Sequence, residues 1–224
     1  MIKNISNLGD AALYCDFGSE VNKQINSEVI KYFNTIREQN INGINNLTPS
    51  YNKLIVSYDL KVTNYKESKD KIEKLNVSES LKTNNKKIEI PVCCDPSFSL
   101  DMKRLENKLN LTKEKILENF FNKEFFCYMT GFIAGMPFLG DLDENMRVQR
   151  LETPRVKVPK GSVGITEQFA DIYTFESPGG WNIIGNTPLE VFDSSKEIDP
   201  NLINPGDTVK FKQISLEEYK NYNE

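Results

Sequence analysis

The chain has 224 residues, and its 28 lysines and arginines against 32 aspartates and glutamates give a net charge of −4 at pH 7. This balance offers no basic field to gather phosphate backbones, so we expect no nucleic-acid partner. The chain contains no histidine, which excludes a serine–histidine or cysteine–histidine catalytic pair and a histidine-ligated zinc site within it. A general base must therefore be a carboxylate, a lysine, a tyrosine or a group from a partner.

Export and membrane insertion are both unexpected. Residues 1–10 lack the cationic flank and long apolar run of a secretory signal. The longest apolar stretch, residues 131–140, contains Pro137 and is far shorter than the roughly 20 residues that a bilayer requires. The cysteines lack CxxC spacing and the density of a disulfide scaffold, which indicates reduced thiols. We therefore expect a cytoplasmic protein with no membrane partner.

The first part of the chain, residues 1–90, alternates strand-like and helix-like patterns of apolar residues. The predicted elements are a strand at 11–17, a helix at 21–36, two strands within 45–58, a helix over 64–75 with Asn64 as its N-cap, and a strand at 86–90. This β-α-β-β-α-β order predicts a ferredoxin-like α+β domain, in which two helices cover one face of an antiparallel sheet.

The second part, residues 91–224, has a different composition, because nine of the ten prolines and nine of the twelve glycines lie at or after Pro91. A domain boundary near residue 90 follows. Two helices, at 100–109 and 113–122, are followed by short segments of strand character, and Ser215 and Glu218 have capping-box spacing. The predicted strands are 125–130, 155–158, 162–165, 171–175, 181–184, 189–192 and 208–213. Many short strands at close spacing predict a mainly β domain with a closed or nearly closed barrel.

The first of three clusters that could carry chemistry is residues 131–140, GFIAGMPFLG. Its three glycines free the backbone, and its apolar side chains could wall a ligand pocket. We take Pro137 and Gly140 as candidate substrate-binding residues. A buried crossover of the barrel would explain the same composition equally well.

The second cluster, residues 153–164, places Arg155 and Lys157 on one side of an extended segment by the period of two. Two cations on one face suit an anion: arginine grips a carboxylate or phosphate with two hydrogen bonds, and lysine adds a compact charge. A solvent-facing edge strand is the alternative.

The third cluster, residues 177–188, contains the single tryptophan of the chain. Gly179 and Gly180 would let backbone N–H groups approach a ligand oxygen, and Trp181 could stack on a planar amide. Trp181 could instead plug the barrel core, with the glycines forming a tight corner. A nucleophilic Ser177 would lack an internal histidine base, which disfavours covalent acyl chemistry. Nearby acids show no diagnostic spacing, so we expect no metal site.

These clusters carry a family resemblance. GFIAGMPFLG, TPRVKVPKGSVGI and SPGGWNIIGNTPLEVFD, with NLGDAALYCDFG near the start and NPGDTVKF near the end, resemble the signature blocks of a family that contains 5-oxoprolinase B subunits and sporulation kinase inhibitors, also described as allophanate hydrolase subunit 1. The resemblance covers essentially the whole chain. It implies a ferredoxin-like domain followed by a cyclophilin-like β-barrel.

The resemblance also implies a function. Members are similar to one subunit of an ATP-dependent 5-oxoprolinase, which opens the lactam of 5-oxoproline to glutamate with companion subunits A and C. ATP, with Mg²⁺, would act in the assembled complex, and this chain alone would bind no cofactor tightly. The implied alternatives are inhibition of a sensor histidine kinase and a subunit of an allophanate or urea-amide hydrolase. The expected catalytic residues are Arg155, Lys157 and Ser177, and the expected substrate-binding residues are Pro137, Gly140, Gly179, Gly180, Trp181 and Thr187.

Several positions depart from the family pattern. Ala134, Met136 and Phe138 replace the usual proline, phenylalanine and tyrosine; Asn186 stands where arginine is usual, and Phe120 where histidine is common. Residues 94–99 replace a glycine-rich stretch. These changes indicate a shifted substrate preference, positions that never carried chemistry, or lost activity.

Overall fold

The computed structural model describes residues 1–77 and 85–222. The chain forms two compact units, residues 1–84 and 85–224. The boundary that we predicted at residue 90 falls inside strand β5 (Lys87–Cys93), which is part of the second unit. Among the described residues, no helix is both long and apolar enough to cross a membrane.

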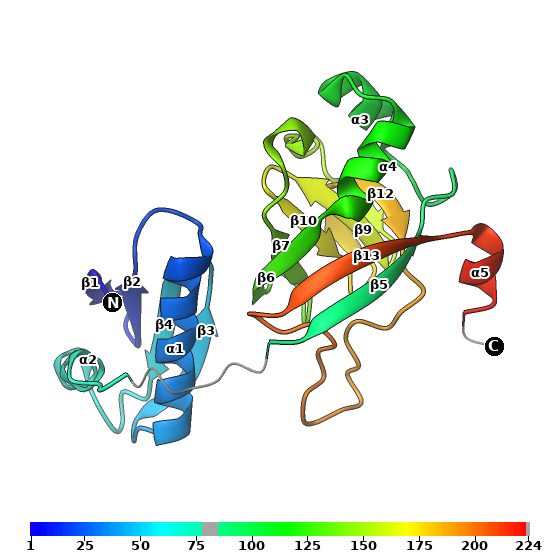
Figure 1. The fold of residues 1–224 in the computed structure, drawn as a ribbon. Helices are drawn as coiled ribbons and strands as arrows, with labels where there is room; N and C mark the ends of the chain where they lie inside the picture. Colours follow the sequence, from blue (N-terminus) through cyan, green and yellow to red (C-terminus); the bar gives the residue numbers. More distant parts are fainter. Residues whose placement is uncertain (78–84, 223–224) are drawn as a thin grey trace. The chain divides into compact units, whose positions relative to one another are not determined.

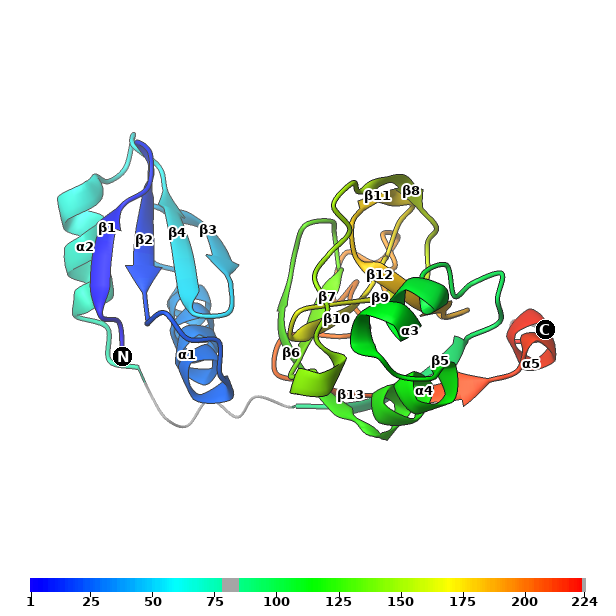
Figure 2. The ribbon, with the colours of Figure 1, turned by 90° about the horizontal axis from the view of Figure 1, so that it is seen from above.

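The first unit is a four-stranded antiparallel sheet with two helices (Figure 1, Figure 2). Its elements are β1 (Asn4–Asn7), β2 (Ala12–Asp16), α1 (Lys23–Gln39), β3 (Ile44–Pro49), β4 (Lys53–Tyr58) and α2 (Tyr65–Glu73). The strand order in the sheet is β1-β2-β4-β3. Both helices pack on one face of it, because Val29 and Ile36 of α1 and Ile72 of α2 share one buried cluster with the inward residues of β2 and β4.

The predicted strand at 86–90 was wrongly assigned to this sheet. It lies in β5, which pairs in parallel with β13 (Thr208–Ile214) in the second unit. The fourth strand of the first sheet is instead β1, which pairs antiparallel with β2. β1 has the sequence NISN and buries only Ile5, so it showed no apolar alternation that could have predicted a strand. The observed order is therefore β-β-α-β-β-α.

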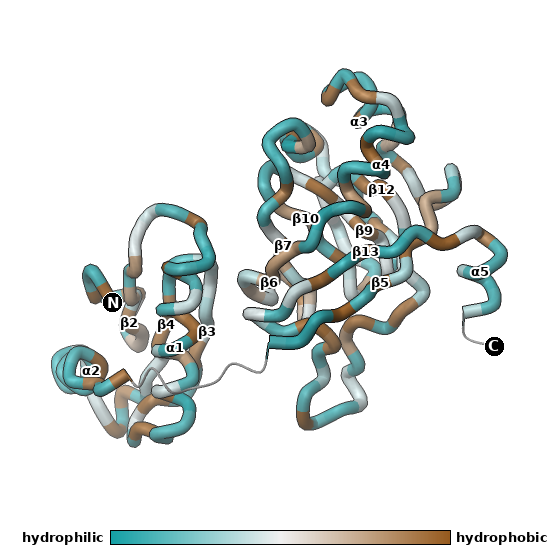
Figure 3. Tube along the Cα trace, viewed as in Figure 1, coloured by the Kyte–Doolittle hydropathy of each residue, from teal (hydrophilic) through white to brown (hydrophobic). Residues whose placement is uncertain are grey.

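Side-chain caps fix where the helices begin. Asn64 accepts a hydrogen bond from the N–H of Glu67, which confirms the predicted N-cap of α2. Asn22 caps α1 in the same way through the N–H of Ile25, and α1 ends at Asn40 in the left-handed region. The capping box of Ser215 and Glu218 is also present, at the start of α5 (Leu216–Lys220). Helix α5 has no buried residue and is mostly hydrophilic (Figure 3).

The second unit is built on a closed seven-stranded barrel, as the succession of short strands predicted. The strand order around it is β10-β7-β6-β13-β5-β12-β9, and the pair β13 and β5 is parallel. The remaining barrel strands are β6 (Glu124–Thr130), β7 (Pro137–Gly140), β9 (Ser162–Thr166), β10 (Phe169–Ile172) and β12 (Asn182–Asn186). The strand predicted at 189–192 is wrong: Phe192 alone forms an isolated bridge, with Asn201.

The other elements of this unit lie outside the barrel sheet. They are α3 (Met102–Leu109), α4 (Lys113–Asn122), the 3₁₀ turn η1 (Glu144–Met146), and the short strands β8 (Arg155–Val158) and β11 (Ser177–Gly179), which form a two-stranded sheet of their own.

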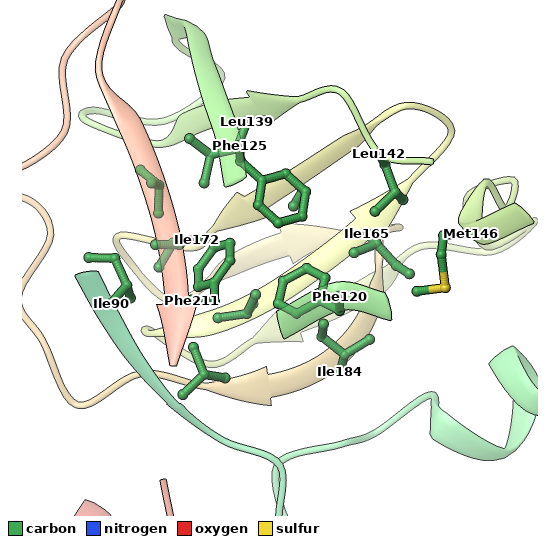
Figure 4. Packing of buried hydrophobic residues seen from close by; sticks show 14 of the residues in the cluster. Ile90, Phe120, Phe125, Leu139, Leu142, Met146, Ile165, Ile172, Ile184 and Phe211 are labelled. Carbon is green, nitrogen blue, oxygen red and sulfur yellow. The ribbon is translucent and has the colours of Figure 1, made fainter. Parts of the chain in front are cut away.

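Phe120, Phe125 and Phe211 pack together within a barrel core that is otherwise mainly aliphatic. Phe120, at the end of α4, is fully buried and stacks on Phe211 of β13 with 4.8 Å between ring centroids, and Phe125 packs against both (Figure 4). Phe120 is therefore a core residue. The difference from the family at this position removes no polar group from a surface site.

Candidate functional site

The three glycine-rich clusters meet on the outer side of the barrel. Strand β8 from the second cluster pairs with β11 from the third, with Arg155 opposite Gly179 and Val158 opposite Ser177 (Figure 2). Val158 shares a small buried cluster with Tyr173, Ile183 and Met136, the last from the first cluster. The hydroxyl of Thr174 also donates to the carbonyl of Ala134, at 2.7 Å.

Arg155 is held by a buried acid. Its Nη2 lies 2.6 Å from Oδ1 of Asp101, and the side chain of Asp101 is 5% exposed against 27% for Arg155. The Nη1 atom of Arg155 is buried and has no hydrogen-bond partner among the described residues. The guanidinium thus keeps one donor nitrogen uncommitted.

Lys157 does not share the partly buried position of Arg155. It forms an ion pair with Glu176 at 2.8 Å, and its side chain is 75% exposed. The hydrogen bond from Lys157 to Glu176 raises the pKa of the ammonium group. The period of two fails here because the pairing of β8 with β11 is shifted by an irregularity between Ser177 and Gly179.

Gly179 and Gly180 leave space for two polar side chains. A Cβ atom at Gly179 would clash with the hydroxyl of Tyr173, and one at Gly180 would lie 3.1 Å from Nε of Arg150. The backbone N–H of Trp181 donates to the Tyr173 hydroxyl, and the half-buried indole packs edge-to-face on Phe138 at 5.5 Å between ring centroids. Trp181 therefore lies beside the cluster and outside the main barrel core.

Ser177 faces the same layer as Arg155. Its partner across the two strands, Val158, is fully buried. The Ser177 Oγ atom is itself buried and has no hydrogen-bond partner among the described residues. A buried polar atom without a partner calls for an explanation, and a bound ligand or water is the usual one.

Asp171 is the most deeply buried acid of the site. Its Oδ1 accepts the N–H of Gly164 at 2.9 Å, while Oδ2 is buried with no partner among the described residues. Burial raises the pKa of Asp171 well above its ordinary value. Burial, and then the charge of Asp171, also raise the pKa of Tyr173, whereas Arg150 and Arg155 act in the opposite direction.

Four residues of this site were missed from the sequence. Asp101 was read as part of a predicted helix, and nothing in the local pattern of Asp171 or Tyr173 separates them from ordinary strand residues. Arg150 lies in a stretch for which we predicted no element. The absence of histidine was the available signal, because it directs attention to buried carboxyl and phenol groups.

The other candidate residues lie elsewhere on the barrel. Pro137 and Gly140 are buried at the two ends of β7, and Gly140 leaves room for the ring of Tyr128. Thr187 lines a surface pocket whose other residues include Lys160, Glu190, Tyr219 and Lys220.

Two further departures from the family pattern have structural roles. Asn186 donates to the carbonyl of Lys160 at 2.9 Å and accepts the hydroxyl of Tyr219 at 2.7 Å, which ties α5 to the barrel. Met136 is 1% exposed in the small cluster described above.

Within residues 1–77 and 85–222, no group of three or more acids or cysteines is placed to hold a metal ion. The four cysteines are buried and free, and burial raises the pKa of Cys15 and of Cys94 to about 12. These thiols are packed as apolar side chains and are poor nucleophiles.

Comparison with known proteins decides the family. The family described as "Carboxyltransferase domain, subdomain C and D" matches residues 3–203. The chain is 35% identical over 233 residues to the 5-oxoprolinase B subunit of Bacillus subtilis, covering 98% of this chain and 96% of that protein. This chain belongs to the family of 5-oxoprolinase B subunits.

Solved structures place the family fold in longer chains as well. TTHA0988 superposes with a TM-score of 0.81 at 26% identity, over 92% of this chain but only 40% of its own. The urea carboxylase of Kluyveromyces lactis shares the fold, with a TM-score of 0.79 at 18% identity over 96% of this chain and 22% of its own. The resemblance to 5-oxoprolinase B subunits that the sequence motifs indicated is confirmed by the identity along the chain.

Proposed function

We propose that this chain is the B subunit of an ATP-dependent 5-oxoprolinase, a hydrolase that opens the cyclic amide of 5-oxoproline to glutamate. The observation that carries the proposal is the 35% identity to a 5-oxoprolinase B subunit along 98% of the chain. Identity of this extent at nearly equal length favours the same role over a shared fold alone.

The outer side of the barrel supplies the chemistry that such a substrate needs. Nη1 of Arg155 and Oγ of Ser177 are buried donors that a substrate carboxylate could accept from. Arg150, whose guanidinium lies against Gly180, adds a second positive charge beside them. Trp181 offers an apolar surface to the five-membered ring. We assign these residues to substrate binding, and Pro137, Gly140 and Thr187 to the surrounding structure.

Lys157 has a different place in the proposal. Its exposed ion pair with Glu176 leaves it outside the buried layer. We propose that it meets a companion polypeptide, because a cation that acts in catalysis would require a cover that excludes water.

The complete reaction requires other subunits. The relatives of matching name are each one subunit of a 5-oxoprolinase, and the fold makes up 40% of TTHA0988 and 22% of a urea carboxylase, so it occurs joined to further polypeptide. We propose subunits A and C as partners, with ATP and Mg²⁺ acting in the assembled cytoplasmic complex. When bound there, ATP would activate the amide carbonyl by phosphorylation. We further propose that the first unit is a ferredoxin-like variant in which β1 takes the fourth strand position.

Reconstitution with companion subunits A and C tests the proposal. We expect ATP-dependent release of glutamate from 5-oxoproline, and an Arg155→Ala variant should lower kcat/KM at least about tenfold, as expected for loss of a charge-assisted hydrogen bond. Lys115→Ala, on the exposed face of α4, is the matched control and should retain activity. No glutamate release, combined with specific capture of a sensor histidine kinase, would reject the proposal in favour of kinase inhibition.

A further inference from the structure

We propose that Asp101 is a positioning residue of the anion site: its carboxylate fixes the guanidinium of Arg155 and offsets the charge, which matches the site to a singly charged carboxylate. This inference rests on the proposed function, because that function gives Arg155 a ligand to bind.

The side chain of Asp101 does not cap its helix, as an aspartate at the N-cap position usually does. Asp101 is the N-cap residue of α3, but its side chain makes no capping hydrogen bond. Capping by aspartate is worth roughly 1 kcal/mol to a helix. The carboxylate is directed instead to β12, where Oδ2 accepts the N–H of Ile183 at 2.7 Å. The N–H of Asp101 also donates to the carbonyl of Ile183, at 3.0 Å.

This double attachment to Ile183 makes Asp101 a fixed anchor. The remaining carboxylate oxygen, Oδ1, receives Nη2 of Arg155 at 2.6 Å. Because the guanidinium is rigid and planar, fixing Nη2 also restricts the direction of Nη1. That nitrogen is buried and without a partner among the described residues. It is the donor that we assign to the substrate carboxylate.

Acidic partners offset part of the positive charge around the site. Asp101 and Arg155 offset one another, and the exposed pair of Lys157 with Glu176 does the same. Two cations remain that no described acid pairs with: Arg150 beside Gly180, and Arg104, which donates to Oδ1 of Asn182 at 2.8 Å. Burial raises the pKa of Asp171, which disfavours a negative charge there. Because Asp101 offsets Arg155, the site presents less positive charge than its arginines alone would, which favours a monocarboxylate over a phosphate dianion.

The Asp101→Asn variant tests both parts of the inference. Its side-chain oxygen can still accept the N–H of Ile183, but the charge that holds Arg155 is gone. In the reconstituted complex we expect KM for 5-oxoproline to rise about tenfold, the cost of one charge-assisted hydrogen bond, with kcat little changed. Inorganic phosphate, used as a competitor, should inhibit the variant more strongly than the unmodified protein.

A double-mutant cycle separates positioning from general support of the fold. If Asp101 acts through Arg155, Asp101→Asn should add nothing to KM in the Arg155→Ala background. Additive effects would overturn the inference. Asp207→Asn is the matched control, because Asp207 is also buried but, among residues 1–77 and 85–222, its carboxylate accepts the backbone N–H groups of Lys86 and Asn204 and no arginine. That variant should leave both KM and phosphate inhibition unchanged.

The outcomes distinguish this inference from the proposed function. If Arg155→Ala impairs turnover but Asp101→Asn leaves KM and phosphate inhibition unaltered, the positioning role is wrong and the proposed function stands. If Arg155→Ala has no effect, the assigned site itself fails. Thermal unfolding checks that each variant is folded. Should Asp101→Asn not fold, Asp101→Glu, which keeps the charge but displaces it by one methylene, should still raise KM, and an unchanged KM would refute positioning.

Discussion

Asp171 makes the stability of the barrel unit depend on pH in a direction opposite to most acids. It is fully buried, and burial raises its pKa well above the ordinary value of 3.8. A carboxyl whose pKa is raised on folding contributes stability that is fully present below the unfolded pKa and is lost as pH rises through the folded pKa. Replacing Asp171 by asparagine removes this titration while the side-chain oxygen can still accept the N–H of Gly164.

The magnitude follows from linkage. Between the unfolded and folded pKa values, one proton is retained by the folded state alone, so the free energy of unfolding should fall by about 1.4 kcal/mol per pH unit relative to Asp171→Asn. Acids whose pKa is lowered on folding, such as Asp16 beside Lys53, have the opposite effect: the stability that they contribute is lost as pH falls. These acids are present in both proteins, so their effect cancels in the difference between the two free energies of unfolding.

Urea unfolding at pH 5, 6, 7 and 8 measures this difference. Trp181, the single tryptophan, has its Cβ 3.0 Å from where a Cβ on Gly164 would lie, so its fluorescence reports on the layer that contains Asp171. The variant also buries an extra N–H donor, which shifts the whole curve without changing its slope. Parallel curves for the two proteins across this range would refute the reasoning.

Three other substitutions test the packing and the caps. Phe120→Ala should destabilise the barrel unit by about 3–5 kcal/mol in urea unfolding, because a fully buried ring is lost from the aromatic core. Gly179→Ala should lower kcat/KM of the reconstituted complex, because the added Cβ would displace the hydroxyl and the ring of Tyr173. Asn22→Ala should cost about 1 kcal/mol through loss of the cap of α1.

Local patterns predicted local structure well. The cap at Asn64 and the capping box at Ser215 lie where the sequence indicated, because each depends on residues within three positions of one another. The closed barrel followed from the succession of short strands. What failed was the choice of partner: residues 86–90 do form a strand, but their alternation does not reveal that residues 208–214 lie beside them.

The residues of the candidate site show the same contrast between local signals and long-range contacts. Sequence reasoning proposed Arg155, Ser177, Gly179, Gly180 and Trp181, and the structure has them on paired or consecutive segments. It missed Asp101, because the hydrogen bonds that divert its carboxylate reach 54 and 82 residues along the chain, to Arg155 and to Ile183. Sequence reasoning also placed Lys157 beside Arg155. The strand irregularity that separates the two side chains depends on how β8 pairs with β11, which the local sequence pattern does not show.

The glycines of the site also make room for polar side chains from other segments. We predicted that Gly179 and Gly180 let backbone N–H groups approach a ligand. These two glycines and Gly164 all have φ values outside the left-handed region. Each leaves space for a polar group from another segment: the carboxyl of Asp171, the hydroxyl of Tyr173 and the guanidinium of Arg150. A side chain at any of them would displace an acid, a phenol or a cation. This chain, which has no histidine, thus brings an acid, a phenol and a cation together in one layer. The three groups fit there because the segments that cover them have glycine, with no side chain, at these points.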